Sequence, residues 1–547
     1  VGRPPPGIPS LMTTDASTAS PRTGQGVPAP SLVARAVQAF SGPVGLTIKL
    51  VLLGAVNALA LWAVGVLLAD ERWLAAALVL VVTVLVDAVY LVPDRRLVPL
   101  KFVLPGTVFL VAFVVIPIIS NANIAFTNWS TGHNLAKDEA ISQIQETSLA
   151  APADGKTYTA APATKDGELV LLLVDDMTGK PYVGSEEGLE PLPADAVTVD
   201  TGAVVAAEGY ELVSGKDLAG IDTQLAGLTI PVSDTSFIRA EGLSLAVELT
   251  PTLRYDAAAD TFTNIETGVV YTDNGEGSYA SAAGEELLPG WKTRVGFQNF
   301  QTIVTDPLVR DPFLRVFVWT FAYAFLSVLI QFAIGLFLAI TLNKPDLRLQ
   351  RFQRALLVLP FAVPAFLAVL VWAGLLNDEF GVVNRTLGTD IPWLFDSNWA
   401  KVSCVLVNVW IGFPYWFLVC TGALQAVPEE LHEAARVDGA GGLQVFRKVT
   451  LPLLLVATAP LLIASFAFNF NLFNNIYFLT QGGPYEVEQT IAGSTDILIS
   501  YTYKIAFQAG SGAQYGLAAA VSIFIFFIVA GISAISFWRT RMLEEIK

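Results

Sequence analysis

The sequence predicts an all-α polytopic membrane protein with about eight transmembrane helices and a β-rich extracytoplasmic domain inserted after the third helix. Three observations predict this class. Of the 547 residues, 53% are hydrophobic and only 15% are charged, whereas soluble chains carry about 25% charged residues. The apolar residues form blocks of roughly 20, the length a helix needs to cross a bilayer. Charge is also unevenly spread, because residues 121–310 hold 28 acidic residues against 10 basic ones.

Eight apolar windows are the predicted spans, and they cover residues 45–68, 73–92, 102–119, 316–342, 355–376, 402–424, 453–479 and 515–537. Lys and Arg cluster after the second, fourth, sixth and eighth windows. With eight spans these clusters share one side, which the positive-inside rule makes the cytoplasm. Both termini are then cytoplasmic, and the acidic segment after the third span is external.

These boundaries divide the chain into four parts. Residues 1–40, rich in Pro, Ser, Thr and Gly, are expected to be a disordered cytoplasmic tail. Residues 41–120 hold the first three spans, 121–311 the external segment, and 312–547 the remaining five. The external segment alternates strand-like runs, such as Leu169–Val174 and Leu243–Leu249, with turns such as Asp273–Gly277. This pattern predicts a small β-rich domain; the alternative is a solvated spacer without a core.

The sequence gives little support for a catalytic, metal-binding or nucleotide-binding site on this chain. The nearest fragment of a phosphate-binding loop is Gly155–Thr157, but Ala150 stands where the first glycine is required. Neither His133 nor His432 has the spacing of a metal ligand, and no nucleophile–base pair is evident. A basic nucleic-acid footprint is absent. We therefore expect no enzyme, metal or cofactor on this chain.

The predicted cytoplasmic loop 426–452 carries the strongest local signals. Pro428 followed by two Glu suits a helix start, so Glu429–Val437 is a predicted short helix that Asp438-Gly439 stops. A second short helix runs to Leu451-Pro452, where the next span begins. This helix–turn–helix would lie on the inner face of the membrane, although its charges also fit an ordinary solvated loop. The side chains it would present to a partner are Glu433, Arg436 and Asp438.

The same loop resembles the EAA signature of ABC-importer permeases. Glu433-Ala434-Ala435 is followed after three residues by Gly439, and after nine more by Val449-Thr-Leu-Pro452, with Val449 in place of the usual Ile. The resemblance implies that the loop docks on an ATP-binding subunit and transmits its closure to the pore. The residues that it assigns to coupling are Glu433, Ala434, Ala435, Asp438, Gly439, Leu451 and Pro452.

Further segments are similar to the MalF-type permeases of maltose/maltodextrin ABC importers. They are Val407–Trp416, Ala464–Asn471, Leu479–Pro484 and Tyr501–Phe507. The layout of eight spans with a large external domain after the third is also that of this family. The resemblance covers the chain from about Val316 to its end, and the N-terminal half agrees in layout more than in sequence.

This resemblance implies a type I ABC importer permease fold, with residues 312–547 as the permease core. It implies import of maltose/maltodextrin-like oligosaccharides by alternating access, although trehalose or another disaccharide is compatible. The implied partners are a MalG-like second permease subunit, a dimer of MalK-like ATP-binding subunits, an extracytoplasmic sugar-binding protein, the oligosaccharide and the lipid bilayer. ATP and Mg would bind the ATP-binding subunits, not this chain.

Two predicted spans carry polar residues at helical spacing. Polar side chains at membrane depth normally face a bundle interior or an aqueous cavity, although they often only join neighbouring helices. In the resembled family such positions line the sugar site, which implies the set Asn408, Gly412, Tyr415, Ser465, Phe468 and Asn469. Leu472 stands where an amide is expected, and Asn471 is the predicted substitute.

Two other classes remain open at this point. An ion-coupled secondary sugar transporter should show internal repeat symmetry and a functional buried carboxylate. A membrane receptor or sensor needs a cytoplasmic output domain, whereas the predicted inner loops are short. Neither class explains the EAA-like loop.

Overall fold

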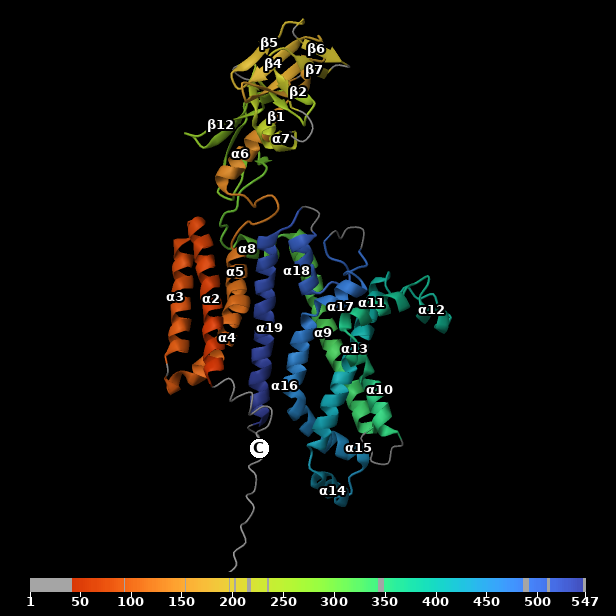
Figure 1. Cartoon of the computed structure of the whole chain (residues 1–547). Coiled ribbons are helices and arrows are strands. Elements are labelled where there is room, and N and C mark those ends of the chain that lie inside the picture. Colours follow the sequence, from red (N-terminus) through yellow and green to blue (C-terminus); the bar gives the residue numbers. More distant parts are fainter. Residues whose placement is uncertain are drawn as a thin grey trace, which may run out of the picture. The chain divides into compact units, whose positions relative to one another are not determined.

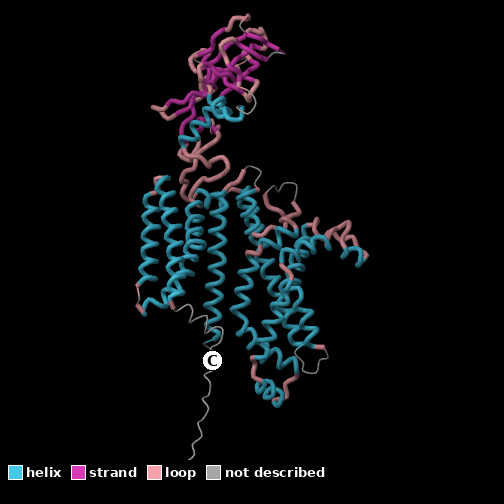
Figure 2. Tube along the Cα trace, viewed as in Figure 1, coloured by secondary structure: helices cyan, strands magenta, loops and turns pink. Residues whose placement is uncertain are grey.

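The computed structural model describes residues 42–544 except 93, 153, 196, 201–202, 214–217, 234–235, 343–348, 486–490 and 509–511. The predicted disordered tail, residues 1–40, lies outside this range, as does part of the basic loop after the fourth span. The chain forms two compact units that meet between Pro117 and Ile118, and each is described by itself. Helices dominate both, and the strands of the second unit fall between residues 149 and 287 (Figures 1 and 2).

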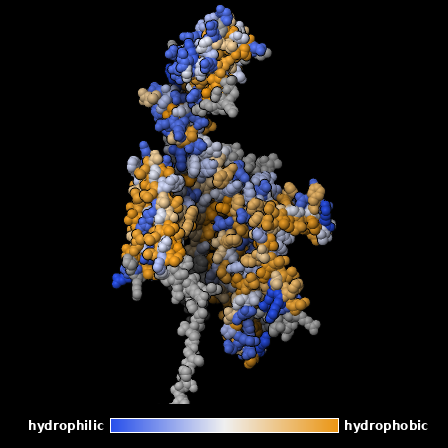
Figure 3. All heavy atoms as spheres, viewed as in Figure 1, coloured by the Kyte–Doolittle hydropathy of each residue, from blue (hydrophilic) through white to orange (hydrophobic). Residues whose placement is uncertain are grey.

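The first unit is built from apolar helices. Their bounds are α2 Pro43–Ala69, α3 Trp73–Leu91, η1 Arg95–Leu97, α4 Val98–Leu110 and η2 Val111–Val115, and α5 Ile116–Ile124 continues into the second unit. Helices α2 and α3 pair antiparallel, and Asn57 Nδ2 donates to Asp87 Oδ1 at 3.0 Å between them. Most of the other side chains of this pair are apolar and exposed (Figure 3). Such a surface suits contact with lipid.

Residues 137–287 form the β-rich region of the second unit. It begins with α6 Lys137–Thr147. The strands are β1 Leu149–Ala150, β2 Thr157–Lys165, β3 Glu168–Asp175, β4 Pro181–Ser185, β5 Gly188–Pro191, β6 Val197–Asp200, β7 Ala203–Ala207, β8 Glu211–Leu212, β9 Thr229–Pro231, β10 Phe237–Ala240, β11 Leu245–Pro251, β12 Leu253–Asp256, β13 Thr261–Asn264, β14 Val270–Asp273, β15 Tyr279–Ser281 and β16 Glu286–Leu287, with α7 Leu218–Gly227 between β8 and β9. The main sheet has the order β5-β4-β3-β2-β11-β10-β9, and β12 to β16 form a second, meandering sheet.

Strand β3 explains why this region has a core. Successive side chains of a strand point to opposite faces, and β3 is buried on both. Leu171 and Leu173 join one apolar cluster, which α7 helps to cover. Val170, Leu172 and Val174 join another cluster, on the opposite face. The prediction of a β-rich region is confirmed, and the alternative of a coreless spacer is wrong.

The remaining helices of the second unit form a bundle. They are α8 Gln298–Thr305, α9 Pro307–Leu342, α10 Gln350–Ala362, α11 Ala365–Leu375, α12 Val382–Leu387, α13 Ser397–Gln425, α14 Glu429–Val437, α15 Gly442–Val445, η4 Phe446–Thr450, α16 Leu451–Phe470, α17 Phe473–Leu479, α18 Leu498–Phe507 and α19 Tyr515–Glu544. Over the described part of the whole chain, seven helices are long and apolar enough to cross a membrane, or eight if the bent pair α10–α11 counts as one span.

Two predicted spans are not single helices. The fifth, 355–376, bends by 92° between α10 and α11, because Val363 precedes Pro364 and takes an extended conformation. The seventh, 453–479, ends as α16 at Phe470, and α17 starts afresh at Phe473 after two non-helical residues. Both predictions of continuous helices were wrong.

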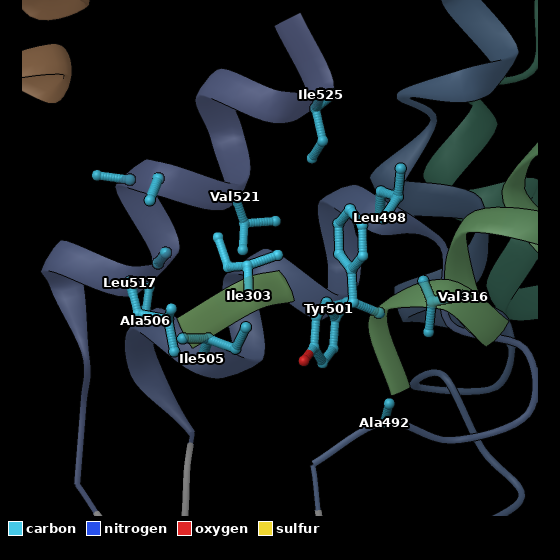
Figure 4. Close-up of a cluster of buried hydrophobic side chains, with 14 of the residues drawn as sticks. Ile303, Val316, Ala492, Leu498, Tyr501, Ile505, Ala506, Leu517, Val521 and Ile525 are labelled. Carbon is cyan, nitrogen blue, oxygen red and sulfur yellow. The ribbon is translucent and has the colours of Figure 1, made fainter. Parts of the chain in front are cut away.

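Close helix contacts hold the bundle together. A Cβ at Gly335 of α9 would lie 2.6 Å from the backbone of Trp416 on α13, so the two helices approach closely only because this residue is glycine. In the N-terminal half of α19, Leu517, Val521 and Ile525 pack with Ile303 of α8 and Tyr501 of α18 (Figure 4). The close approach at Gly335 joins α9 to α13, two of the helices that line the cavity described next.

Candidate functional site

A cavity of about 670 Å³ lies within the helix bundle, between α9, the α10–α11 pair, α13, α16 and α17. The structure brings all six sequence-predicted substrate residues to its wall. Asn408, Gly412 and Tyr415 come from α13, and Ser465, Phe468 and Asn469 come from α16. Asn408 and Asn469 are buried, whereas 67% of Phe468 is exposed. The helical spacing seen in the sequence therefore does place these residues on facing helix surfaces.

The break between α10 and α11 opens onto the same cavity. Val363 and Pro364, at the bend, both line it. Irregular backbone at membrane depth is tolerated where it lines a cavity or is buried in protein, and broken helices recur at transporter binding sites. The bend therefore belongs to the site.

Gln331 of α9 is a cavity residue that the sequence reasoning missed. Its Nε2 donates to the carbonyl oxygen of Asn408 at 2.9 Å. A Cβ at Gly412 would lie 2.4 Å from the Gln331 amide, so the glycine leaves the space that this amide occupies. A polar residue in an apolar span was a signal that could have found it.

The amides of the wall are joined to one another. Asn475 Nδ2 donates to Asn408 Oδ1 at 3.1 Å, and Asn408 Nδ2 donates to Asn469 Oδ1 at 2.6 Å. Asn469 Nδ2 in turn donates to the carbonyl oxygen of Ser465 at 2.8 Å. The chain of bonds connects α17, α13 and α16. These residues thus do bond neighbouring helices, as the alternative interpretation held, and they line a cavity at the same time.

The amide that is missing at Leu472 is not supplied by the residue that was predicted to supply it. Leu472 lines the cavity, but Asn471 does not; it is exposed, and its Nδ2 donates to the Ala467 carbonyl at 3.2 Å. The expected substitution by Asn471 is therefore wrong. The additional amide comes from Asn475, because the chain turns between α16 and α17 and re-aims the residues that follow.

The loop between α13 and α16 has the predicted first helix. Helix α14 covers Glu429–Val437, with Pro428 before it and Asp438 after it. Gly439 then takes a φ of +80°, a conformation that glycine adopts without strain. Glu433, Ala434, Arg436 and Asp438 are exposed, and Ala435 is half-buried.

The second helix of the loop differs from the prediction. No break occurs at Leu451-Pro452, because one helical rod runs from Gly442 to Phe470. Its segment η4 is π-helical and ends at Thr450, two residues before Pro452, which lacks the N–H for a regular bond. His432 of α14 is within hydrogen-bond distance of this rod, with its Nε2 3.1 Å from Thr450 Oγ1. The rod therefore joins the loop to Ser465, Phe468 and Asn469 in the cavity.

A buried ion pair outside the cavity was also missed. Lys504 Nζ of α18 lies 2.5 Å from Asp496 Oδ2, and the two side chains are 5% and 0% exposed. Ser500 Oγ donates to Asp496 Oδ1, and the Gly493 N–H donates to its Oδ2, each at 2.7 Å. Burial raises the pKa of the Asp496 carboxyl, while the Lys504 ammonium and these hydrogen bonds act in the opposite direction. Gly482 packs directly on the pair, since a Cβ there would lie 2.1 Å from Asp496 Oδ1.

Comparison with known proteins gives concordant matches. The family described as "Binding-protein-dependent transport system inner membrane component" matches residues 331–538, and "N-terminal of TM subunit in PBP-dependent ABC transporters" matches 108–187. The chain is 36% identical over 472 residues to the maltose/maltodextrin transport system permease protein MalF of Salmonella typhimurium, covering 83% of this chain and 89% of that one. It is 32% identical over 560 residues to MalF of Vibrio vulnificus, covering 98% and 100%. Among solved structures, a bacterial ABC transporter involved in alginate import matches at 23% identity and TM-score 0.39, over 45% of this chain and 84% of that one.

Proposed function

Because this chain belongs to the MalF family of permease proteins in binding-protein-dependent ABC transport systems, we propose that it imports maltose/maltodextrin-like oligosaccharides by alternating access. It is a multi-pass membrane permease, and its family membership removes the secondary-transporter and receptor alternatives. The substrate class is inferred from the relatives, whose names specify maltose and maltodextrin.

The single observation that best supports this proposal is the cavity between α13 and α16. Its volume of about 670 Å³ falls in the range of small-molecule sites. Asn408 and Asn469 offer amides for sugar hydroxyls, and Tyr415 and Phe468 offer aromatic faces for the apolar C–H surface of a pyranose. No charged residue is among those that line it, which suits a neutral sugar.

We assign the partners by family and by the exposed loop. ATP and Mg would bind a dimer of MalK-like subunits, so that hydrolysis takes place outside this chain. Helix α14 would dock on one of them, with Glu433 and Arg436 at the contact. A MalG-like permease would complete the pathway, and a sugar-binding protein would deliver the substrate from outside.

Purification of the tagged chain from its host in mild detergent tests this assembly. A P-loop ATPase and a second permease should co-purify, and Glu433→Lys should release the ATPase. Glu379→Lys is the matched control, since Glu379 is also exposed but lies between α11 and α12, away from the loop. Retention of the ATPase by Glu433→Lys, or its loss in both variants, would contradict the docking role.

The proposed topology places the β-rich region outside the cytoplasm and α14 and both termini inside. It can be tested with single cysteines at two exposed positions, Met177 in the β-rich region and Val437 at the end of α14. Cys404 and Cys420 are buried and form no disulfide, so their background labelling should be low. A membrane-impermeant maleimide should label position 177 in intact spheroplasts and position 437 only after permeabilisation. The reverse pattern would invert the topology.

A further inference from the structure

The amides of the cavity wall form a relay with a fixed direction. Its last acceptor is the carbonyl oxygen of Ser465, which can only accept, so Asn469 must point its Nδ2 toward it. Asn469 Oδ1 then faces Asn408 and accepts from Asn408 Nδ2. Asn408 Oδ1 must in turn accept from Asn475 Nδ2. The orientation of each amide follows from the one before it.

This direction leaves the first residue of the relay with an unpaired acceptor. Asn475 is 3% exposed, and its Oδ1 has no hydrogen-bond partner within the described structure. A flipped Asn475 would place two amide oxygens against each other and would leave its NH₂ group unpaired instead. Buried polar atoms in native proteins are nearly always paired with protein or ordered water, so an acceptor at a cavity wall that no protein group fills is available to water or to a ligand that enters the cavity.

The chemistry of that group is constrained on both sides. An amide oxygen takes only a hydrogen-bond donor. No Lys, Arg, Asp or Glu is among the residues that line the cavity, so a charged ligand would find no counter-ion there and would be costly to bury. A neutral ligand with hydroxyl donors fits these conditions.

We propose that Asn475 Oδ1 accepts a hydrogen bond from one hydroxyl of the transported saccharide, and that Asn475 is thereby a specificity-determining residue of the cavity. This inference rests on the proposed function and goes beyond it by assigning a defined hydroxyl to a defined atom. When that hydroxyl binds, each link from the sugar through Asn475, Asn408 and Asn469 to the Ser465 carbonyl has one donor and one acceptor. The relay then ties α17, α13 and α16 more firmly in the loaded state.

Tyr323 provides the competing explanation within the protein. Its buried hydroxyl on α9 makes no hydrogen bond of full geometry in the described structure, but it lies close enough to the Asn475 side-chain amide to interact with it. A small rotation could therefore let this hydroxyl donate to Asn475 Oδ1 without any ligand. The experiment must therefore separate a sugar hydroxyl from the Tyr323 hydroxyl.

The test compares Asn475→Leu with the wild type in proteoliposomes that hold the complete transporter, with saturating sugar-binding protein and ATP. Initial uptake rates are measured for a disaccharide and for its series of monodeoxy analogues. The variant should import the parent sugar about 5- to 10-fold more slowly, the loss expected for one hydrogen bond. One analogue, which lacks the hydroxyl that Asn475 accepts, should be imported equally by both proteins. This is a double-mutant cycle between a residue and a ligand group.

Asn471→Ala is the matched control, because it removes a neighbouring amide that does not line the cavity, and it should leave all rates unchanged. If Asn475→Leu does not assemble, Asn475→Ala makes the same comparison without added bulk. Equal slowing of every analogue, or no slowing, would overturn the assignment. So would Tyr323→Phe if it reproduced the analogue pattern of Asn475→Leu. Failure of the wild type to import any saccharide would refute the proposed function instead.

Discussion

Replacing Lys504 by Met should expose how strongly the loop between α17 and α18 depends on its buried ion pair. Methionine keeps most of the length of the side chain and removes the ammonium group. The Asp496 carboxylate then loses its only ion-pair partner in the described structure while remaining 0% exposed. Its hydrogen bonds from Ser500 and Gly493 remain. The change removes the opposite charge together with the hydrogen bond of 2.5 Å that Lys504 Nζ donates to the Tyr485 hydroxyl.

The expected cost follows from the burial of both groups. Removing one member of a buried pair typically costs about 3–5 kcal/mol. Because two hydrogen bonds still reach the carboxylate, we expect a value near the lower end, about 3 kcal/mol at pH 8. This corresponds to an increase of roughly 150-fold in the equilibrium for local opening.

Hydrogen exchange provides the assay, because local opening exposes amides that the folded loop protects. The amides of Gly493 and Thr495 are bonded to the Asp496 carboxylate and to the Gly482 carbonyl, respectively. Peptides that cover residues 491–498 should therefore exchange roughly 150-fold faster in the variant. Lys401→Met is the control, since the ammonium group of that half-buried lysine lies over the ring of Trp319 and forms no ion pair among the described residues.

The pH dependence of the destabilisation by Lys504→Met gives a second, independent test. Burial raises the pKa of the Asp496 carboxyl, and without Lys504 this effect is unopposed by the ammonium. A carboxyl whose folded-state pKa exceeds its unfolded value loses stability as the pH rises from the unfolded value through the folded one. The variant should therefore be closer to the wild type at pH 5 than at pH 8. Asp496→Asn combined with Lys504→Met should recover most of the loss. A change below about 1 kcal/mol in the single variant, or a double variant less stable than the single one, would refute the reasoning.

Three other predictions follow from the structure. Lys137 and hydrogen bonds from tyrosines lower the pKa of Asp260 to about 2. The stability that these contacts provide should be present above pH 4 and lost as the pH falls toward 2. Lys137→Met should therefore shift the acid-induced hydrogen exchange of β12–β15 to higher pH. Gly412→Ala places a Cβ 2.4 Å from the Gln331 amide, so uptake should fall at least about 10-fold while complex assembly, measured by gel filtration, is retained. His432→Ala removes the contact with Thr450 and should lower the amount of sugar imported per ATP hydrolysed. His432→Gln should restore part of this ratio. Equal ratios in the wild type and both variants would exclude a positioning role.

Local signals made α14 predictable from the sequence. Pro428 and the two acidic residues after it mark its start, and Gly439 marks its end through a conformation that few other residues adopt. Helical spacing also showed which polar residues of α13 and α16 share a face, whereas the assignment of the six residues to a sugar site came from the resemblance to MalF-type permeases.

Other features depend on contacts that sequence spacing does not encode. The two-residue turn after Phe470 decides that Asn475 enters the cavity while Asn471 leaves it. The ion pair of Lys504 with Asp496 was not predicted, because its burial depends on tertiary packing around α18 and not on spacing along the chain. The bend at Pro364 did have a signal, since a second proline lies four residues earlier, but a hydropathy window averages over both.

The continuous rod from Gly442 to Phe470 has a mechanical consequence. It contains Pro460, and helix bending concentrates at prolines. At 1.5 Å per residue, Pro460 lies about 27 Å from Gly442 and about 14 Å from Asn469. A lever with its fulcrum at this proline would deliver about half of any docking-end displacement to the sugar end, with a proportionate gain in force. Paired spin labels near the two ends, each measured against α9, should record distance changes in a ratio of about two; equal changes would show that the rod moves as a rigid body.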